Sequence, residues 1–96
     1  MLLAVDAAHA ADKRAKSMDG QAIYKSTCSA CHGTNLVGAP MLGDKKAWAP
    51  IIAQGQNVII AHATKGIRGM PPKGGNPALT AAEIKAAVEF MVARGK

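Results

Sequence analysis

The sequence Cys28-Ser29-Ala30-Cys31-His32 contains the only two cysteines of this 96-residue chain, followed directly by a histidine. This C-x-x-C-H spacing is the attachment signal of c-type haem. On a helical turn, residues three apart lie on the same face, so both thiols can add to the vinyl groups of one haem. His32 then lies under the iron and can donate a ring nitrogen to it. The motif predicts one haem c, covalent through Cys28 and Cys31, with His32 as an axial ligand.

Zinc binding and dithiol redox chemistry are the competing interpretations of these cysteines. Zinc would need two further ligands, and the remaining histidines, His9 and His62, do not have the spacing of a zinc finger. A thioredoxin-like dithiol would need alternating strands and helices, and no strand pattern is present. Haem attachment is the interpretation that the spacing favours.

A bound haem would also help to stabilise a chain of this small size. A chain of 96 residues forms one small domain, which buries only about 60–65% of its unfolded surface. The aromatic residues are Tyr24, Trp48 and Phe90, and no disulfide remains once both cysteines bind haem. Burying a few hundred Å² of haem would contribute on the order of 10 kcal/mol at roughly 25 cal/mol per Å². We expect the chain without haem to be poorly folded.

The charge of the chain bears on its partners. Twelve Lys and Arg against six Asp and Glu give a net charge of +6, which can steer association with acidic proteins. Nucleic acid is excluded because the chain lacks clustered arginines and stacking aromatic residues. No apolar run approaches the roughly 20 residues that span a bilayer, so we expect a soluble protein. Basic residues flank the haem-binding segments and predict either a positive ring around an exposed haem edge or an ordinary solvated face: Lys25, Lys45, Lys46, Lys65, Arg68 and Lys73.

The chain divides into a lead, residues 1–16, and a haem-binding domain, residues 17–96. The lead has an apolar start and a small-x-small sequence at Ala8-His9-Ala10, but its apolar run is short, contains Asp6 and follows no basic residue. It is either the remnant of an export signal or an N-terminal extension. Export to the periplasm is expected in both cases, because haem c is attached outside the bacterial cytoplasm.

The domain itself is predicted to be all-α. Thr80-Ala81-Ala82-Glu83 is a capping box, and Ser17 and Asp44 are plausible caps of earlier helices. Gly20 lies inside the first predicted helix at a cost of about 1 kcal/mol, which either close approach of another helix or fraying explains. No strand pattern appears, so we expect about four helices wrapped around one haem, over residues 17–30, 44–54, 56–65 and 80–95, with loops at 33–43 and 66–79.

The sixth iron ligand has to come from elsewhere in the chain, and the candidates are Met18, Met41, Met70, Met91, His9 and His62. Met18 and Met91 have the helical spacing of core residues, and Met41 follows His32 too closely to reach the opposite face of the haem. Met70 lies on a glycine- and proline-rich loop, where the fixed backbone of the two following prolines can hold a thioether in place. We therefore predict His32 and Met70 as the iron ligands, with His62 as the alternative to Met70.

Two further residues are predicted to bind at the site. A ligating histidine usually donates its second ring nitrogen to a backbone carbonyl, and Pro40 is placed to supply that carbonyl. The alternative is that Pro40 only stiffens the loop. Trp48 has an indole N–H that needs an acceptor when buried, and a haem propionate is the predicted acceptor, with plain core packing as the alternative.

These features together resemble the bacterial class I cytochromes c, over about Met18 to Arg94. The nearest type is the small cytochromes of the c-five and c-five-fifty-five kind. The resemblance rests on the haem motif and on five further sequences: Gly20-x-x-x-Tyr24, Gly38-Ala39-Pro40, Leu42-Gly43-Asp44, Ala47-Trp48-Ala49-Pro50 and Gly69-Met70-Pro71-Pro72-Lys73-Gly74-Gly75. It implies that residues 17–96 are a cytochrome c domain in which His32 and Met70 ligate iron and Pro40 holds His32. It also implies that the first helix crosses the last near Phe90. One departure is that Asn76-Pro77-Ala78-Leu79 stands where the c-five group has an additional cysteine pair.

The expected function is that of the family. The resemblance implies a soluble, monomeric one-electron carrier between membrane or periplasmic redox enzymes. No residue has the setting of a general acid or base, so we do not expect an enzyme. One alternative is a haem-based ligand-binding or peroxidase-like protein in which the sixth ligand is labile, and another is a domain shed from a larger oxidoreductase.

Overall fold

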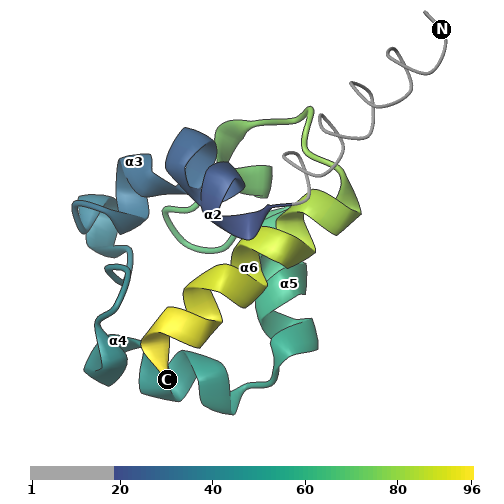
Figure 1. The fold of residues 1–96 in the computed structure, drawn as a ribbon. Helices are drawn as coiled ribbons and strands as arrows, with labels where there is room; N and C mark the ends of the chain where they lie inside the picture. Colours follow the sequence, from purple (N-terminus) through teal and green to yellow (C-terminus); the bar gives the residue numbers. More distant parts are fainter. Residues whose placement is uncertain (1–18) are drawn as a thin grey trace, which may run out of the picture.

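The computed structural model describes residues 19–96, which form a bundle of helices with irregular connections (Figure 1). Within these residues the one extended pairing is an isolated bridge between Ile67 and Met70, so the predicted all-α class is confirmed. None of the described helices is long and apolar enough to cross a membrane. In chain order the elements are α2 (Gly20–Ile23), the π-helix η1 (Tyr24–Cys28), α3 (Ser29–His32), the 3₁₀ turn η2 (Leu36–Gly38), α4 (Lys45–Ala53), α5 (Gln56–Lys65), the 3₁₀ turn η3 (Pro72–Gly75) and α6 (Ala81–Gly95).

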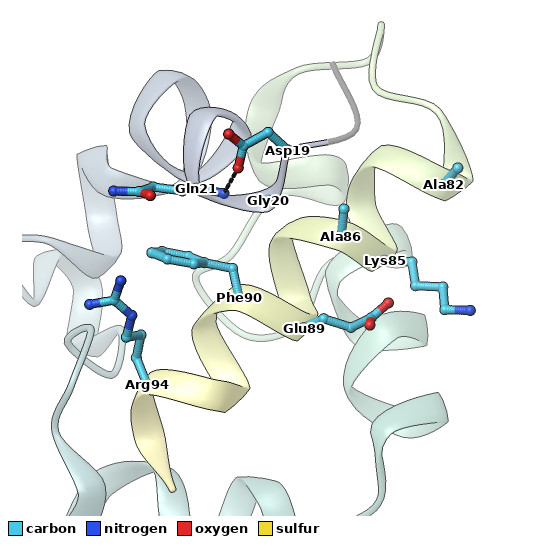
Figure 2. Close-up of a pocket in the computed structure, with 9 residues that line it drawn as sticks. All are labelled: Asp19, Gly20, Gln21, Ala82, Lys85, Ala86, Glu89, Phe90 and Arg94. Carbon is cyan, nitrogen blue, oxygen red and sulfur yellow. Dashed lines mark hydrogen bonds between the residues drawn. The ribbon is translucent and has the colours of Figure 1, made fainter. Parts of the chain in front are cut away.

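The first predicted helix is present but is divided into three parts. It begins at Gly20, where the Asp19 carboxylate caps α2 by accepting a hydrogen bond from the Gln21 backbone N–H at 2.9 Å (Figure 2). The predicted cap, Ser17, lies outside the described residues. The π-helix η1 then widens the backbone spacing, and the Ser29 N–H bonds the Tyr24 carbonyl five residues back. The segment continues as α3 to the end of the haem motif.

The other three helices have the predicted positions. The Asp44 carboxylate accepts a hydrogen bond from the Ala47 N–H at 3.1 Å and so caps α4. At the start of α6, Thr80 and Glu83 form both halves of the predicted capping box, at 3.1 and 2.9 Å. These local hydrogen bonds satisfy N–H groups that a helix leaves unpaired at its first turn. They account for the agreement between the predicted and observed helix starts.

Helix α6 packs against each of the other main helices and carries most of the core. It runs diagonally across the view, with α2 crossing it near its middle and α4 lying near its end (Figure 1). Its buried face meets apolar side chains from α2, η1, α4, α5 and the segment before α6: Ile84, Ala87, Val88, Met91 and Val92 against Ile23, Tyr24, Trp48, Ile59, Ala63 and Leu79. The assignment of Met91 to the core is thereby confirmed.

The crossing of α2 over α6 explains the glycine at position 20. A Cβ atom at Gly20 would overlap the backbone carbonyl of Ala86 and lie 3.0 Å from Phe90 Cβ. One turn later the Tyr24 ring packs on the Phe90 ring with 5.5 Å between centroids. The predicted close approach of another helix is confirmed, although Gly20 is the first residue of α2 and not an interior one.

The predicted loop at 66–79 is present, and ordered turns form within it. Ile67 and Met70 exchange backbone hydrogen bonds at 3.1 and 2.8 Å, and the turn η3 follows directly. Glycine and proline end helices, but they also favour successive tight turns, which is what they form here.

Candidate haem site

All six predicted site residues line one cavity in the middle of the molecule. Its walls come from the haem motif, α4, α5, the 66–71 segment and α6. They are mainly apolar, and the predicted site residues contribute Cys28, Cys31, His32, Pro40, Trp48 and Met70. The fold therefore brings Met70 to the same cavity as the C-x-x-C-H motif.

The two cysteines lie on successive turns of the η1–α3 segment. Both are half-buried and neither is in a disulfide. Burial, and to a smaller degree the charge of Cys31, raises the pKa of the Cys28 thiol. A raised pKa disfavours the thiolate that disulfide exchange requires, which argues against a dithiol redox role. Within residues 19–96 no group of three or more His, Cys, Asp or Glu could hold a metal ion.

The imidazole of His32 is buried and held by one short hydrogen bond. Its Nδ1 atom lies 2.8 Å from the Pro40 carbonyl oxygen, the contact predicted from the sequence. Because a carbonyl can only accept, Nδ1 carries the proton and Nε2 keeps its lone pair for a metal. The His32 backbone carbonyl also accepts a hydrogen bond from Leu42 N–H at 2.9 Å, which ties the loop to the motif. The loop thus holds His32 through both its ring and its backbone.

The indole of Trp48 has a different acceptor from the one predicted. Its Nε1–H donates to the backbone carbonyl of Met41 at 2.9 Å, so the prediction of a propionate acceptor is wrong. The loop after the haem motif places that carbonyl beside the indole nitrogen. Because an indole has a single N–H to donate, this bond leaves none for a propionate. Trp48 is 3% exposed, and its ring centroid lies 6.1 Å from that of His32. It serves as an apolar wall of the cavity.

The candidates for the sixth ligand are separated by the fold. Met70 is half-buried and lines the cavity from the Ile67–Met70 turn, whereas the Met41 side chain is 42% exposed and is not among the lining residues. Met18 and His9 lie outside the described residues. Met91 borders the cavity as part of the core.

His62, the predicted alternative to Met70, also faces the cavity. It is half-buried on α5, and its neighbours Ile59 and Ala63 line the same space. Its spacing of three residues from Ile59 is the helical signal that places both side chains on the same face of α5.

A second hollow lies outside the bundle, where α2 crosses α6 (Figure 2). Charged side chains from α6 and from Asp19, the N-cap of α2, surround it, and Arg94 lies over the Phe90 ring at 4.9 Å. It contains no cysteine, histidine or methionine, so it has no donor for haem iron: its lining is Asp19, Gly20, Gln21, Ala82, Lys85, Ala86, Glu89, Phe90 and Arg94.

The central cavity fits a haem on three counts. The lining is apolar, two free thiols lie on one segment, and an imidazole nitrogen is left available by a hydrogen bond on the other side of its ring. A helical fold with this set of donors defines the class of c-type cytochromes.

Comparisons with known proteins identify the family. Residues 15–91 match the family model described as cytochrome c oxidase, cbb3-type, subunit III. The chain is 51% identical to cytochrome c-555 of Chlorobaculum thiosulfatiphilum over 80% of this chain and 94% of the relative. It is 37% identical to cytochrome c5 of Azotobacter vinelandii over 75% of this chain and 89% of the relative. The chain therefore belongs to this cytochrome c family as a small class I cytochrome c, and its cofactor is covalent haem c.

A solved structure agrees with this assignment. The fold matches a chain from a crystal structure of an electron transfer complex of nitrite reductase with cytochrome c, with a TM-score of 0.76 and 43% identity. The match covers 80% of this chain and 94% of that chain.

Proposed function

We propose that this class I cytochrome c, an electron carrier, holds its haem iron between His32 and Met70, with Cys28 and Cys31 as the points of attachment. The observation that carries the proposal is that His32 and Met70 line the same apolar cavity. The His32 ring is held by the Pro40 carbonyl, and the Met70 backbone is held by hydrogen bonds with Ile67. When bound, the haem supplies an iron that accepts and returns one electron.

Hydrogen bonds hold the two proposed ligands in place, which favours rapid electron exchange. Pro40 holds the His32 ring, and the bond pair between Ile67 and Met70 holds the backbone that carries the thioether. Fixed ligands leave little to rearrange between the two oxidation states, which is a form of preorganisation. Trp48 and Ile59 are buried walls that keep water away from the ligands.

An electron carrier and a ligand-binding or peroxidase-like protein differ in whether the sixth position is open. A methionine lines the cavity from a hydrogen-bonded turn, which favours a closed site. No residue of the cavity has a role as a general acid or base in this proposal, because the two cysteines and His32 hold the haem. We infer an electron carrier without an enzymatic activity of its own.

The charge supports a proposal for the partners. Residues 19–96 contain nine Lys and Arg against four Asp and Glu, and Arg68 borders the cavity itself. The related structure is a complex of a cytochrome c with nitrite reductase, a redox enzyme. We infer that this protein works as a monomer in the periplasm and docks acidic surfaces of redox enzymes there or at the membrane.

The ligand assignment is tested by replacing Met70 with alanine in the haem-loaded protein. Met70→Ala is expected to abolish the sulfur-to-iron charge-transfer band of the ferric spectrum and to give high-spin or ligand-exchanged haem. The matched control is Met41→Ala, which removes an exposed methionine and should leave the spectrum unchanged. An unchanged band in Met70→Ala would refute the assignment. Rapid binding of carbon monoxide by the ferrous wild type at neutral pH would favour the ligand-binding alternative.

A further inference from the structure

We propose that Gly66 is the positioning residue that keeps Met70 at the iron, an inference that rests on the ligand assignment above. Gly66 ends α5 with φ 87° and ψ 154°, a conformation open almost only to glycine. It lies between the helix that lines one wall of the cavity and the turn that carries Met70. The backbone of that turn begins here.

Three backbone hydrogen bonds connect α5 to Met70. The Gly66 N–H donates to the His62 carbonyl at 2.7 Å, which fixes Gly66 on the helix end. Ile67 and Met70 then bond each other in both directions, from Ile67 N to Met70 O at 3.1 Å and from Met70 N to Ile67 O at 2.8 Å. The position of the Met70 backbone is therefore set by the end of α5.

The turn folds back so closely that position 66 has no room for a side chain. A Cβ atom there would lie 2.8 Å from the Met70 carbonyl oxygen, 3.0 Å from Pro72 N and 3.1 Å from Pro72 Cδ. All three atoms belong to the backbone or to a proline ring, and none can rotate away. Any side chain at this position has to displace the segment on both sides of Pro71, and the Met70 thioether moves with it.

Displacement of Met70 has a chemical consequence at the iron. A thioether is a neutral, weak donor that depends on correct placement, and a displaced one leaves the sixth position to other ligands. Gly66 thus keeps the site closed, as an electron carrier requires, where a side chain would favour an open, ligand-binding haem. This function follows from its contact with Met70 and not from its backbone conformation alone.

The same helix offers a matched control. Gly55 precedes α5 with φ 97° and ψ 147°, nearly the conformation of Gly66, but a Cβ atom there would meet nothing within 4 Å. Gly55→Ala and Gly66→Ala impose a similar backbone strain at the two ends of one helix. The collision with Met70 and Pro72 is present in Gly66→Ala alone.

The test is a titration of the ferric holoproteins with imidazole, followed by the loss of the sulfur-to-iron band. Imidazole should bind Gly66→Ala about tenfold or more tightly than the wild type, because a displaced thioether competes less well. Gly55→Ala should bind imidazole within about twofold of the wild type while losing thermal stability as Gly66→Ala does. Equal imidazole affinities for the two variants would overturn the proposal.

The outcome separates this inference from the ligand assignment. A wild type without the sulfur-to-iron band contradicts Met70 as the ligand, whereas a wild type with the band and an unaffected Gly66→Ala contradicts the role of Gly66. If Gly66→Ala gives no haem-loaded protein, amide hydrogen exchange of the ferric wild type decides. The Ile67 and Met70 amides should exchange as slowly as those of α5; exchange at the rate of an unstructured peptide, with the band intact, would refute the proposal.

Discussion

Two neighbouring backbone carbonyls accept hydrogen bonds from the N–H groups of the two buried rings of the haem site. Pro40 accepts from His32 at 2.8 Å, and Met41 accepts from Trp48 at 2.9 Å. Among the described residues no buried side-chain nitrogen or oxygen lacks a partner. The first pairing could be predicted, because a ligating histidine requires an acceptor and Pro40 follows the motif. The second depends on where the loop places the Met41 carbonyl, which no local pattern indicates.

At the same scale, Tyr24 should make stability depend on alkaline pH. Tyr24 is 7% exposed, and burial raises the pKa of its phenol above its ordinary value, which is about 10. A phenol with a raised native pKa stays protonated where the unfolded chain ionises. The contribution of the neutral phenol to the stability of the fold is therefore fully present below the pKa that Tyr24 has in the unfolded chain. It is lost as the pH rises from that value through the pKa of Tyr24 in the native protein.

The measurement is denaturant unfolding of the ferric protein between pH 7 and pH 11. Above about pH 10 the free energy of unfolding of the wild type should fall more steeply than that of Tyr24→Phe, by up to about 1.4 kcal/mol per pH unit. Below about pH 9 the two proteins should run parallel, since the phenol is then neutral in both states. Parallel curves up to pH 11 would show that Tyr24 ionises equally in both states.

At the scale of elements, the sequence predicts what local chemistry decides. The caps at Asp44 and Thr80 are formed by side chains within three residues of the groups they bind, so α4 and α6 begin where expected. The π-helix over Tyr24–Cys28 was not predicted, because no local sequence pattern distinguishes its i→i+5 hydrogen bonds from those of an α-helix. The Ile67–Met70 turn was missed for a similar reason, since its folding back depends on Gly66 and Pro72 meeting in space.

The contact between α2 and α6 gives an element-scale prediction. Gly20→Ala should destabilise the protein by about 2 kcal/mol, because the new methyl group would collide with the Ala86 backbone carbonyl, which cannot rotate away. A gain in helix propensity offsets little at the first residue of a helix. The loss corresponds to a fall in Tm of roughly 8–16 °C for a domain of this size.

Thermal unfolding of the holoproteins by circular dichroism measures this loss. The control is Gln21→Ala, an exposed change on the same helix that should shift Tm by no more than about 4 °C. A wild-type Tm in Gly20→Ala would mean that α2 can move away from α6 without cost.

At the scale of the whole molecule, the haem site is a cavity lined by residues from separate segments of the chain. The chemistry-bearing residues could be predicted because each belongs to a short motif, but the walls could not. Ile59, Val88 and Met91 line the cavity from α5 and α6, and their sequence pattern shows only that they face inward. His62 belongs to the same wall: its spacing from Ile59 places it on that face of α5, and the packing of α5 shows that this face borders the cavity.

The distribution of charge is also a property of the whole molecule, and it can be tested at the exposed side of the cavity. Arg68 borders the cavity, whereas Lys85 of α6 is exposed beside the outer hollow and does not line the cavity. If electrons leave near Arg68, a local positive potential should accelerate oxidation by an anion and slow oxidation by a cation. Ferricyanide and tris(phenanthroline)cobalt(III) are probes of opposite sign for this purpose.

Stopped-flow oxidation of the ferrous protein should therefore respond to salt in opposite directions for the two probes. Between about 0.01 and 0.15 M salt the Debye length falls from about 30 to about 8 Å, so the rate with ferricyanide should fall about tenfold and the rate with the cobalt complex should rise. Arg68→Gln should flatten both responses, while Lys85→Gln, which removes the same charge away from the cavity, should change them little. Equal effects of the two substitutions would mean that only the net charge matters, and flat responses of the wild type would remove the case for docking through a basic surface at the haem.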